Sequence, residues 1–227
     1  MKILYNFPSR ERPYKFFNAI DNIISMARHD DYFILATLDI DDASMNNREV
    51  KLKLDSYGEK VKAVYGTSMG KCDAVNRDIW MFIEGVDIVV THSDDFWIDV
   101  PGFDLDIIEG FADGFRGLLH FPDGHANERL VTYPILHADY YKRFNYIYHP
   151  SFVSVYADNF QTDVAKHLNQ YKYVDKKRIT HRHPIWGYGV SDALLLRTEH
   201  PLQYWRDNAT YLKLKENNYG LTKISEL

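Results

Sequence analysis

Residues 85–97, with the sequence GVDIVVTHSDDFW, form the stretch that decides the fold. The apolar run from Ile88 to Val90 predicts a short buried strand, because such runs are typical of strands covered on both faces in parallel α/β sheets. Ligands of these sheets bind just beyond the carboxyl ends of the strands. Asp94 and Asp95 follow the run, so we expect their carboxylates at the mouth of a ligand crevice.

Two adjacent carboxylates at the end of a strand suit a divalent cation. Hard carboxylate oxygens are the ligands that Mg²⁺ and Mn²⁺ prefer, and either ion would in turn hold a phosphate group. The competing interpretation is a solvated turn, which is the more common origin of an Asp-Asp pair considered alone, because acids are frequent in turns. The metal interpretation therefore needs support from the rest of the chain.

The N-terminal part of the chain predicts alternating strands and helices. Before the strand at 88–90, the hydrophobic pattern predicts, in this order, strand 2–7, helix 13–27, strand 32–38, helix 45–56, strand 61–65 and helix 71–79. Strands separated by helices make βαβ repeats, and thus a parallel, Rossmann-like sheet. Polar or acidic clusters follow the first two strands, and a Gly/Ser loop follows the third, which indicates a nucleotide crevice at one sheet edge.

The second half of the chain has a less regular pattern. It predicts helices at 103–112, 138–144, 158–168 and 201–217, and strands at 117–121 and 130–133. The sequence has no internal repeat, and no linker divides the chain. We therefore expect one compact α/β domain with an irregular second half.

Composition is that of an ordinary soluble globular protein. Of its 227 residues 45% are hydrophobic and 26% charged, and the net charge of −5 would not attract nucleic acid over the whole surface. The single cysteine, Cys72, excludes a disulfide framework and favours a reducing compartment. No run approaches the roughly 18 apolar residues that span a bilayer, and the N-terminus lacks a signal-peptide pattern. We therefore expect a soluble, cytoplasmic protein.

Three shorter motifs suggest chemistry and are ambiguous alone. The loop at 66–72 is not a Walker phosphate loop, because its glycines are one residue too close and a cysteine stands where Ser or Thr must bind magnesium. Lys71, at a helix N-terminus, could still meet a phosphate. His181 and His183 follow a strand-like segment and should face the same way, which suits a metal site or, equally, a solvated basic loop. Asp158 could be a helix N-cap or a general base.

Taken in order, these segments resemble the inverting, family 2-like glycosyltransferases of the A-type fold. The similarity covers most of the chain, residues 2–220, and its specificity lies in the order and spacing of the segments. The matching segments are Pro8-Ser9-Arg10-Glu11-Arg12-Pro13, Asp39-Ile40-Asp41-Asp42, Tyr65-Gly66 with Lys71, Ala74 and Asn76, Ser93-Asp94-Asp95, Asp158-Asn159, and His181-Arg182-His183-Pro184 with Trp186.

The resemblance implies a single A-type glycosyltransferase domain over residues 1–227, with a mostly parallel central sheet flanked by helices. Residues 1–97 would form the nucleotide-sugar-binding half, and residues 98–227 an irregular acceptor-binding half. The implied activity is a metal-dependent, inverting transfer of a sugar from a nucleotide-diphosphate donor, expected to be a UDP-sugar, to an acceptor hydroxyl.

The resemblance also implies roles for single residues. Asp39 would hydrogen-bond the base, and Asp158 would take the proton from the acceptor hydroxyl. Asp95 would hold Mn²⁺ or Mg²⁺ on the diphosphate with help from Asp94, although Ser93 replaces the first acid of the family's metal motif. The implied set consists of nucleotide-binding Pro8, Ser9, Arg10, Arg12, Asp39, Lys71, Asn76 and Asp94, the metal ligands Asp95, His181 and His183, and the catalytic Asp158.

The acceptor is expected to be a saccharide, with a hydroxymethylated DNA base as the second hypothesis. The segment 166–182 is rich in Lys and Arg, contains only Asp175 as an acid and has tyrosines between the cations, as nucleic-acid contact surfaces do. A solvated positive face is the more common explanation of such a segment.

Two other functions stay open from the sequence. A sugar-phosphate nucleotidyltransferase can share the nucleotide-binding half, but its glycine-rich first loop is missing here. A non-catalytic nucleotide- or carbohydrate-binding protein would explain Ser93 in the metal motif. Turnover of a nucleotide sugar separates an enzyme from this last class.

Overall fold

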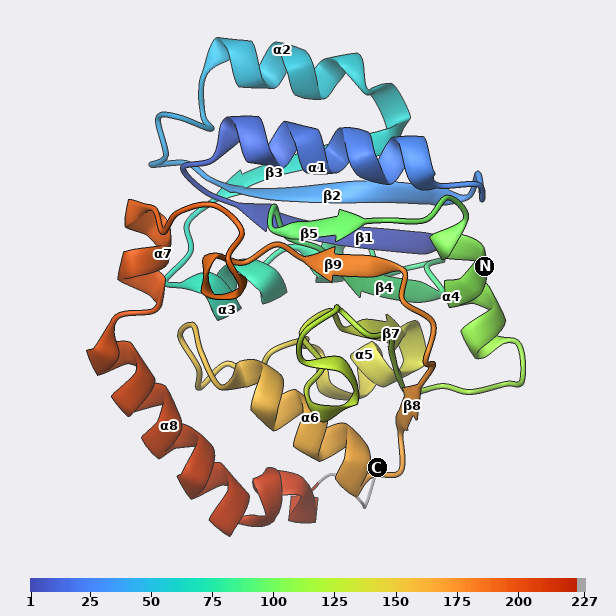
Figure 1. Ribbon diagram of the computed structural model, residues 1–227, viewed down its shortest axis with the longest axis vertical. Helices are drawn as coiled ribbons and strands as arrows, with labels where there is room; N and C mark the ends of the chain where they lie inside the picture. Colours follow the sequence, from blue (N-terminus) through green and yellow to red (C-terminus); the bar gives the residue numbers. More distant parts are fainter. Residues whose placement is uncertain (224–227) are drawn as a thin grey trace.

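The computed structural model describes residues 1–223, and one seven-stranded sheet runs through them (Figure 1). The strand order is β3-β2-β1-β4-β7-β6-β8, and β5 and β9 form a separate two-stranded sheet. The last four residues of the predicted acceptor-binding half, 224–227, lie outside the described residues. The strands are β1 Ile3–Ser9, β2 Tyr32–Asp39, β3 Val61–Gly66, β4 Ile88–Thr91, β5 Phe96–Ile98, β6 Leu118–His120, β7 Ile135–His137, β8 Tyr171–Tyr173 and β9 Ile179–His181.

The N-terminal half of the sheet is parallel, as predicted. Strand β1 lies between β2 and β4 and is parallel to both, and β2 is parallel to β3. All eight residues of β2 are buried, as are all four of β4, which explains their continuous apolar runs. The carboxyl ends of these four strands therefore meet at one edge of the sheet, and the predicted α/β architecture with a mostly parallel sheet is confirmed.

The second half extends the same sheet by an antiparallel step. Strand β7 is antiparallel to β4, and β6 is antiparallel to β7. Strand β6 therefore points the same way as β4, so the residues that follow β6 also lie at the ligand edge. This placement brings the loop after His120 to the residues after β4.

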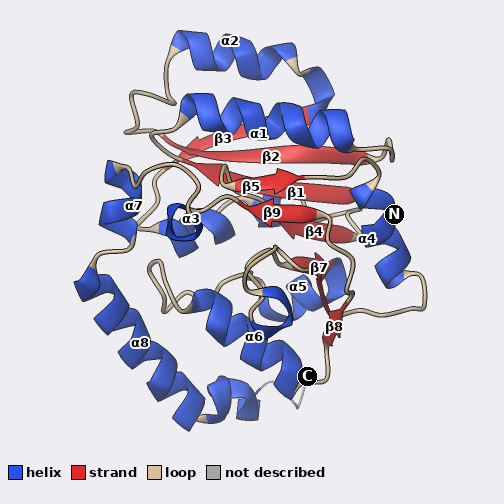
Figure 2. Ribbon diagram, in the orientation of Figure 1, coloured by secondary structure: helices blue, strands red, loops and turns tan. Residues whose placement is uncertain are grey.

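Helices cover both faces of the sheet (Figure 2). Helices α1, α2 and α4 pack on one face, and α3, α5 and α6 on the other. Helix α8 lies along the outside of α6 (Figure 1). The helices are α1 Pro13–Met26, α2 Arg48–Ser56, α3 Lys71–Asn76, α4 Phe103–Phe111, α5 Ala138–Phe144, α6 Ala157–His167, α7 Ala193–Thr198 and α8 Pro201–Glu216.

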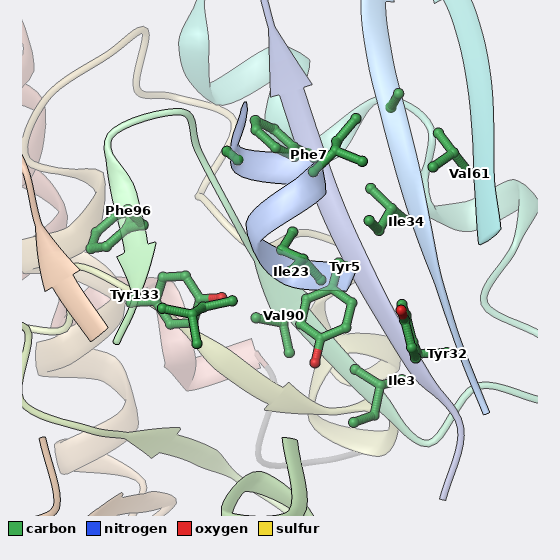
Figure 3. Packing of buried hydrophobic residues seen from close by; sticks show 14 of the residues in the cluster. Ile3, Tyr5, Phe7, Ile23, Tyr32, Ile34, Val61, Val90, Phe96 and Tyr133 are labelled. Carbon is green, nitrogen blue, oxygen red and sulfur yellow. The ribbon is translucent and has the colours of Figure 1, made fainter. Parts of the chain in front are cut away.

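Side-chain alternation along β1 divides the core into two. Ile3, Tyr5 and Phe7 point to the α1 face, where Ile23 of α1 packs among them (Figure 3). Leu4 points to the opposite face and packs with the α3 and α5 side chains. All of these side chains are completely buried. A strand covered on both faces in this way holds its register firmly, because a one-residue slip would exchange the two sets.

The prediction of a strand at 130–133 is wrong. The chain there is a bend, and the strand that pairs with β4 is β7, which begins after Pro134. Val131 and Tyr133 are buried by packing and not by a ladder. The alternating apolar pattern therefore indicated buried side chains and not a strand. The hydrogen-bonded pairing with β4 begins only after Pro134, which has no N–H to donate.

The other expected elements are present with small shifts at their ends. The helix expected over 45–56 begins at Arg48, with Asn47 as its N-cap. The helix expected over 71–79 ends at Asn76 and is followed by a 3-10 turn. Four short strands or helices were not predicted, namely β5, β7, β8 and α7. No helix within residues 1–223 has the length and apolarity needed to cross a membrane.

We expect Leu4→Ala to lower the free energy of unfolding by about 2–5 kcal/mol, because the side chain is fully buried at the centre of the sheet. The matched control is Leu52→Ala on α2, where the side chain is 58% exposed and the change should stay within about 0.5 kcal/mol. Urea unfolding of both variants measures the difference. Equal losses in the two variants would contradict the central position of β1.

Candidate active site

Four loops meet at the carboxyl edge of the sheet, and each carries predicted site residues. The loop after β1 provides Arg10 and Arg12, and the end of β2 provides Asp39. The loop after β3 leads into α3 at Lys71, and the loop after β4 carries Asp95. The parallel pairing thus brings together residues that are far apart in the sequence.

Asp39 is buried and held by three side chains. Its carboxylate accepts hydrogen bonds from Arg10 at 2.9 Å, from the Ser68 hydroxyl at 2.7 Å and from Arg77 at 3.1 Å. Neither Ser68 nor Arg77 was predicted. Arg77 reaches Asp39 beneath β3 because the position above it is Gly66, where a Cβ would lie 2.9 Å from the Arg77 Cζ. The carboxylate is therefore fixed in orientation and its charge is balanced.

Arg12 ties the loop after β1 to the C-terminal part of the chain. Its guanidinium binds both carboxylate oxygens of Asp192, at 2.7 and 2.6 Å, and one oxygen of Asp94 at 3.0 Å. Burial and the nearby charge of Asp95 raise the pKa of Asp94 to about 6, against the opposing effect of Arg12. The Asp94 carboxylate therefore already has an ion-pair partner in Arg12.

Asp95 and His181 form the central pair of the site. The Asp95 Oδ2 lies 3.3 Å from the His181 Nε2, and the Ser93 hydroxyl donates to the Asp95 Oδ1. Burial disfavours the charged forms of both groups, yet their mutual attraction prevails. Asp123 and Asp95 together raise the pKa of His181 to about 9, and His181 lowers the pKa of Asp95 well below its usual range.

Residues 1–223 contain no cluster of three or more His, Cys, Asp and Glu side chains that could hold a metal ion. The pair of Asp95 and His181 nevertheless fits a divalent ion that is shared with a substrate, because Mg²⁺ commonly takes one or two carboxylates plus substrate phosphates. The Nδ1 of His181 is buried without a hydrogen-bond partner, and it lies 3.7 Å from an oxygen of Asp123. A carboxylate behind a histidine is the usual arrangement that orients a metal-binding imidazole.

His183 is less suited to a metal than predicted from its spacing. Strand β9 ends at His181, so the two histidines do not share a strand face, although their rings lie 5.3 Å apart. The Nδ1 of His183 accepts from the backbone N–H of Ile185, and its Nε2 lies 3.2 Å from Glu199. Both ring nitrogens therefore already have partners within the chain.

Asp158 lies in the first turn of α6 and is not its N-cap. The N-cap is Tyr156, which adopts a left-handed conformation with φ 61°. The Asp158 carboxylate accepts only from the N–H of Asn159, at 2.9 Å, among the hydrogen bonds of the described residues. Burial raises its pKa, while the charges of Lys71 and His181 oppose the change. The group is thus a half-buried carboxylate near two cations, with free capacity to accept a proton.

The remaining predicted residues have different surroundings. Lys71 begins α3 and makes no salt bridge to the described carboxylates, so its ammonium is available. Pro8 and Ser9 end β1, and the Ser9 hydroxyl is buried without a partner in the described chain. The Asn76 amide is used within the protein, because it binds backbone groups of Ile147 and Tyr148 at 2.6–3.1 Å.

A cleft of about 490 Å³ lies beside the Asp95–His181 pair. It is bordered by α1, by β5 and by the segment that leads into α7. Its polar lining includes both signs of charge, and Tyr188 and Trp97 add aromatic surface. The lining residues that carry charge or an imidazole are Arg12, Lys15, Asp94, Asp95, Arg182 and His183.

Asp123 is a site residue that sequence analysis missed. It is completely buried, and its carboxylate accepts from the N–H groups of residues 125–127 and from the Thr132 hydroxyl. It stands behind His181 at the ligand edge, as described above. Asp123 follows strand β6, so the rule that singled out Asp95, an acid just after a buried strand, would have found it.

The basic segment 166–182 is largely neutralised in three dimensions. Lys176 and Arg178 pair with Asp106 of α4, at 3.4 and 2.5 Å, and Lys172 pairs with Asp113 at 2.7 Å. These acids lie more than 50 residues earlier in the sequence, so a local count could not include them. The segment therefore presents far less free positive charge than its composition indicates.

No protein-family model matches the sequence, and no curated protein matches it significantly. Solved structures do match. The chain is similar to S. aureus TarS, with a TM-score of 0.61 and 13% identity over 79% of this chain and 36% of TarS, so it spans little more than a third of that protein. It is also similar to the mannosyltransferase PcManGT from Pyrobaculum calidifontis, with a TM-score of 0.64 and 12% identity over 95% of this chain and 75% of that one.

A third similar structure is the catalytic domain of Drosophila β1,4-galactosyltransferase 7, with a TM-score of 0.56 and 10% identity over 88% of this chain and 81% of that one. At these identities the likeness concerns the fold. The mostly parallel seven-stranded sheet flanked by helices agrees with that likeness. This chain has the A-type glycosyltransferase fold.

Proposed function

We propose that this protein is a metal-dependent, inverting glycosyltransferase that moves a sugar from a nucleotide-diphosphate donor to an acceptor hydroxyl. The observation that carries the proposal is the arrangement at the carboxyl edge of the sheet. There the Asp95–His181 pair and the uncommitted carboxylate of Asp158 lie close to the free Lys71 ammonium. The similar mannosyltransferase structure was solved with GDP-Man and Mn²⁺, which is in keeping with a nucleotide-sugar donor and a divalent ion.

The donor's base would bind at Asp39. A carboxylate accepts N–H groups, and the N3–H of uracil and the N1–H and N2 amino group of guanine present such donors on their Watson–Crick edges. Arg10, Arg77 and Ser68 keep this carboxylate in one orientation. We favour a UDP-sugar, because TarS was solved with UDP-GlcNAc and the Drosophila galactosyltransferase with UDP-Gal. Pro8 and Ser9 would line the same end of the site, and Arg12 would line the cleft beside Asp95.

The diphosphate would lie between Lys71 and the Asp95–His181 pair. Asp95 and His181 would hold Mn²⁺ or Mg²⁺ there, and the ion would supply Lewis-acid stabilisation of the negative charge that develops on the leaving diphosphate. Lys71 is the first residue of α3, and its ammonium adds a positive charge beside the diphosphate. Ser93 contributes by donating to Asp95, which positions the carboxylate, and it is not itself a ligand in this proposal.

Asp158 would be the general base. Its burial raises its pKa, which makes the ionised carboxylate a better proton acceptor than an exposed aspartate. A single base that activates the acceptor hydroxyl allows one-step displacement through an oxocarbenium-like state, which inverts the anomeric centre. The acceptor would be a saccharide hydroxyl, since the ion pairs of segment 166–182 leave little charge to hold DNA.

We expect Asp158→Asn to lower kcat for sugar transfer by about 10²–10⁴-fold and to leave nucleotide binding intact, because the amide cannot take the proton. Release of the nucleoside diphosphate from UDP- and GDP-sugars measures transfer, and thermal unfolding with and without nucleotide measures binding. The control is Asp175→Asn, which changes an exposed acid.

The wild-type rate should also depend on pH. We expect it to fall as the pH is lowered through the pKa of Asp158, because the base must be ionised, and burial places this pKa above the ordinary aspartate value of 3.8.

Near-normal transfer by Asp158→Asn would remove Asp158 from the role of base. Nucleotide binding without any turnover of nucleotide sugars by the wild type would favour a binding protein. Joining of a sugar phosphate to a nucleotide would instead favour a nucleotidyltransferase.

We expect no binding of duplex DNA even at low ionic strength, because Lys172, Lys176, Lys177 and Arg178 of segment 166–182 pair with acids of α4 and its neighbouring loops. Fluorescence anisotropy with a labelled duplex, with and without hydroxymethylated bases, measures the affinity. Binding that weakens steeply as salt is added would revive the DNA acceptor.

A further inference from the structure

Asp207 is a completely buried carboxylate on α8. Its oxygens accept from the backbone N–H groups of Val153 at 3.3 Å, Ser154 at 3.0 Å and Val155 at 2.9 Å. Among the side chains that the structure describes, which end at Leu221, no Lys, Arg or His forms an ion pair with it. A buried charge is costly unless hydrogen bonds satisfy it, so these three amides are what stabilises the carboxylate in place.

The three amides belong to the loop that enters α6. Tyr156 follows them in a left-handed conformation, with φ 61°, which a non-glycine residue keeps only when its surroundings enforce it. Helix α8 supplies part of that enforcement, because Tyr211 stacks on Tyr156 with ring centroids 5.7 Å apart and Tyr204 meets it edge-on at 6.3 Å. Asp158 comes two residues later. Helix α8 thus helps to fix the point at which α6 begins.

The same loop also contacts the start of α3. The carbonyl oxygen of Val153 accepts from the N–H of Cys72 at 3.0 Å. The approach is so close that a Cβ on Gly70 would lie 2.8 Å from the Val153 side chain and 2.9 Å from its carbonyl oxygen. Lys71 lies in the sequence between Gly70 and Cys72, the two residues that make these contacts. The loop at 153–155 therefore connects both Asp158 and Lys71 to the buried carboxylate on α8.

We propose that Asp207 is a positioning residue for the reaction, which acts by holding the 153–155 loop and thereby placing Asp158 relative to Lys71. The inference rests on the proposed function, because it assigns Asp158 the role of base. Displacement of a reacting group by an ångström can lower a rate by about 10²-fold, so the loop has to be held firmly. Helix α8 then contributes to the active site through the loop that it holds.

The alternative is that Asp207 merely attaches α8 to the body of the protein. The chain offers a matched control for this alternative in Asp163 of α6. Its carboxylate accepts from Tyr211 at 2.6 Å and Tyr219 at 3.0 Å and pairs with Lys215 at 3.1 Å. Asp163 therefore also ties α6 to the C-terminal elements, but it makes no hydrogen bond to the 153–155 loop.

The test compares Asp207→Asn with Asp163→Asn in the full-length protein. Asparagine keeps one acceptor oxygen and turns an NH₂ group toward the amides, so the loop loses part of its anchor. We expect Asp207→Asn to lower kcat at least about tenfold with the donor KM changed less than about threefold. Hydrogen exchange of the 153–155 amides should accelerate in this variant. Asp163→Asn removes no hydrogen bond from the loop, so it should change the melting temperature while affecting kcat and that exchange much less than Asp207→Asn does, even though Asp163 binds the hydroxyl of Tyr211.

Three results would overturn the proposal. One is an unchanged kcat in Asp207→Asn, and another is an equal loss of kcat in Asp163→Asn. The third is rapid hydrogen exchange of the 153–155 amides in the wild type, at the rate of an exposed loop. This measurement needs neither a variant nor enzyme turnover. A wild type that transfers no sugar would contradict the proposed function, and exchange in Asp207→Asn would still decide whether Asp207 holds the loop.

Discussion

The parallel register of β1 with β2 and β4 is the constraint on which the site depends. It brings the carboxyl ends of these strands to one edge, where Arg10 binds Asp39 and where Asp95 also lies, although the three residues are far apart in the sequence. The antiparallel insertion of β7 keeps β6 in the same direction, and the same edge therefore receives Asp123 as well. Backbone pairing in the core thus sets the spacing of groups that lie near the surface.

Crowded carboxylates at this edge require cations, and the chain supplies them selectively. Arg10 and Arg77 balance Asp39, Arg12 balances Asp94 and Asp192, and His181 balances Asp95. Asp158 has no direct cationic partner among the described residues, and burial raises its pKa. This contrast separates carboxylates that are fixed as acceptors or ligands from one that is free to exchange a proton, and it is the electrostatic basis of the proposed function.

Local sequence patterns predicted the helices and strands that have strong hydrophobic periodicity. They failed where contacts between residues far apart in the sequence determine the structure. The runs that became β1–β4 and the helices α5 and α8 were predicted closely, because burial on both faces or on one helix face dominates their composition. The segment 130–133 was misassigned because its apolar residues pack without a ladder. Asp207, Arg77 and the acids that neutralise segment 166–182 act across long sequence separations, which no local pattern contains.

The central claim is that Asp95 binds a metal–nucleotide complex at the carboxyl edge of the sheet. Thermal unfolding with UDP, GDP, CDP and dTDP, each with and without Mn²⁺, tests it most directly, since a ligand that binds only the folded state raises the melting temperature. The account predicts a metal-dependent rise with UDP that Asp95→Asn abolishes. No rise with any nucleotide, or the same rise in Asp95→Asn, would contradict it.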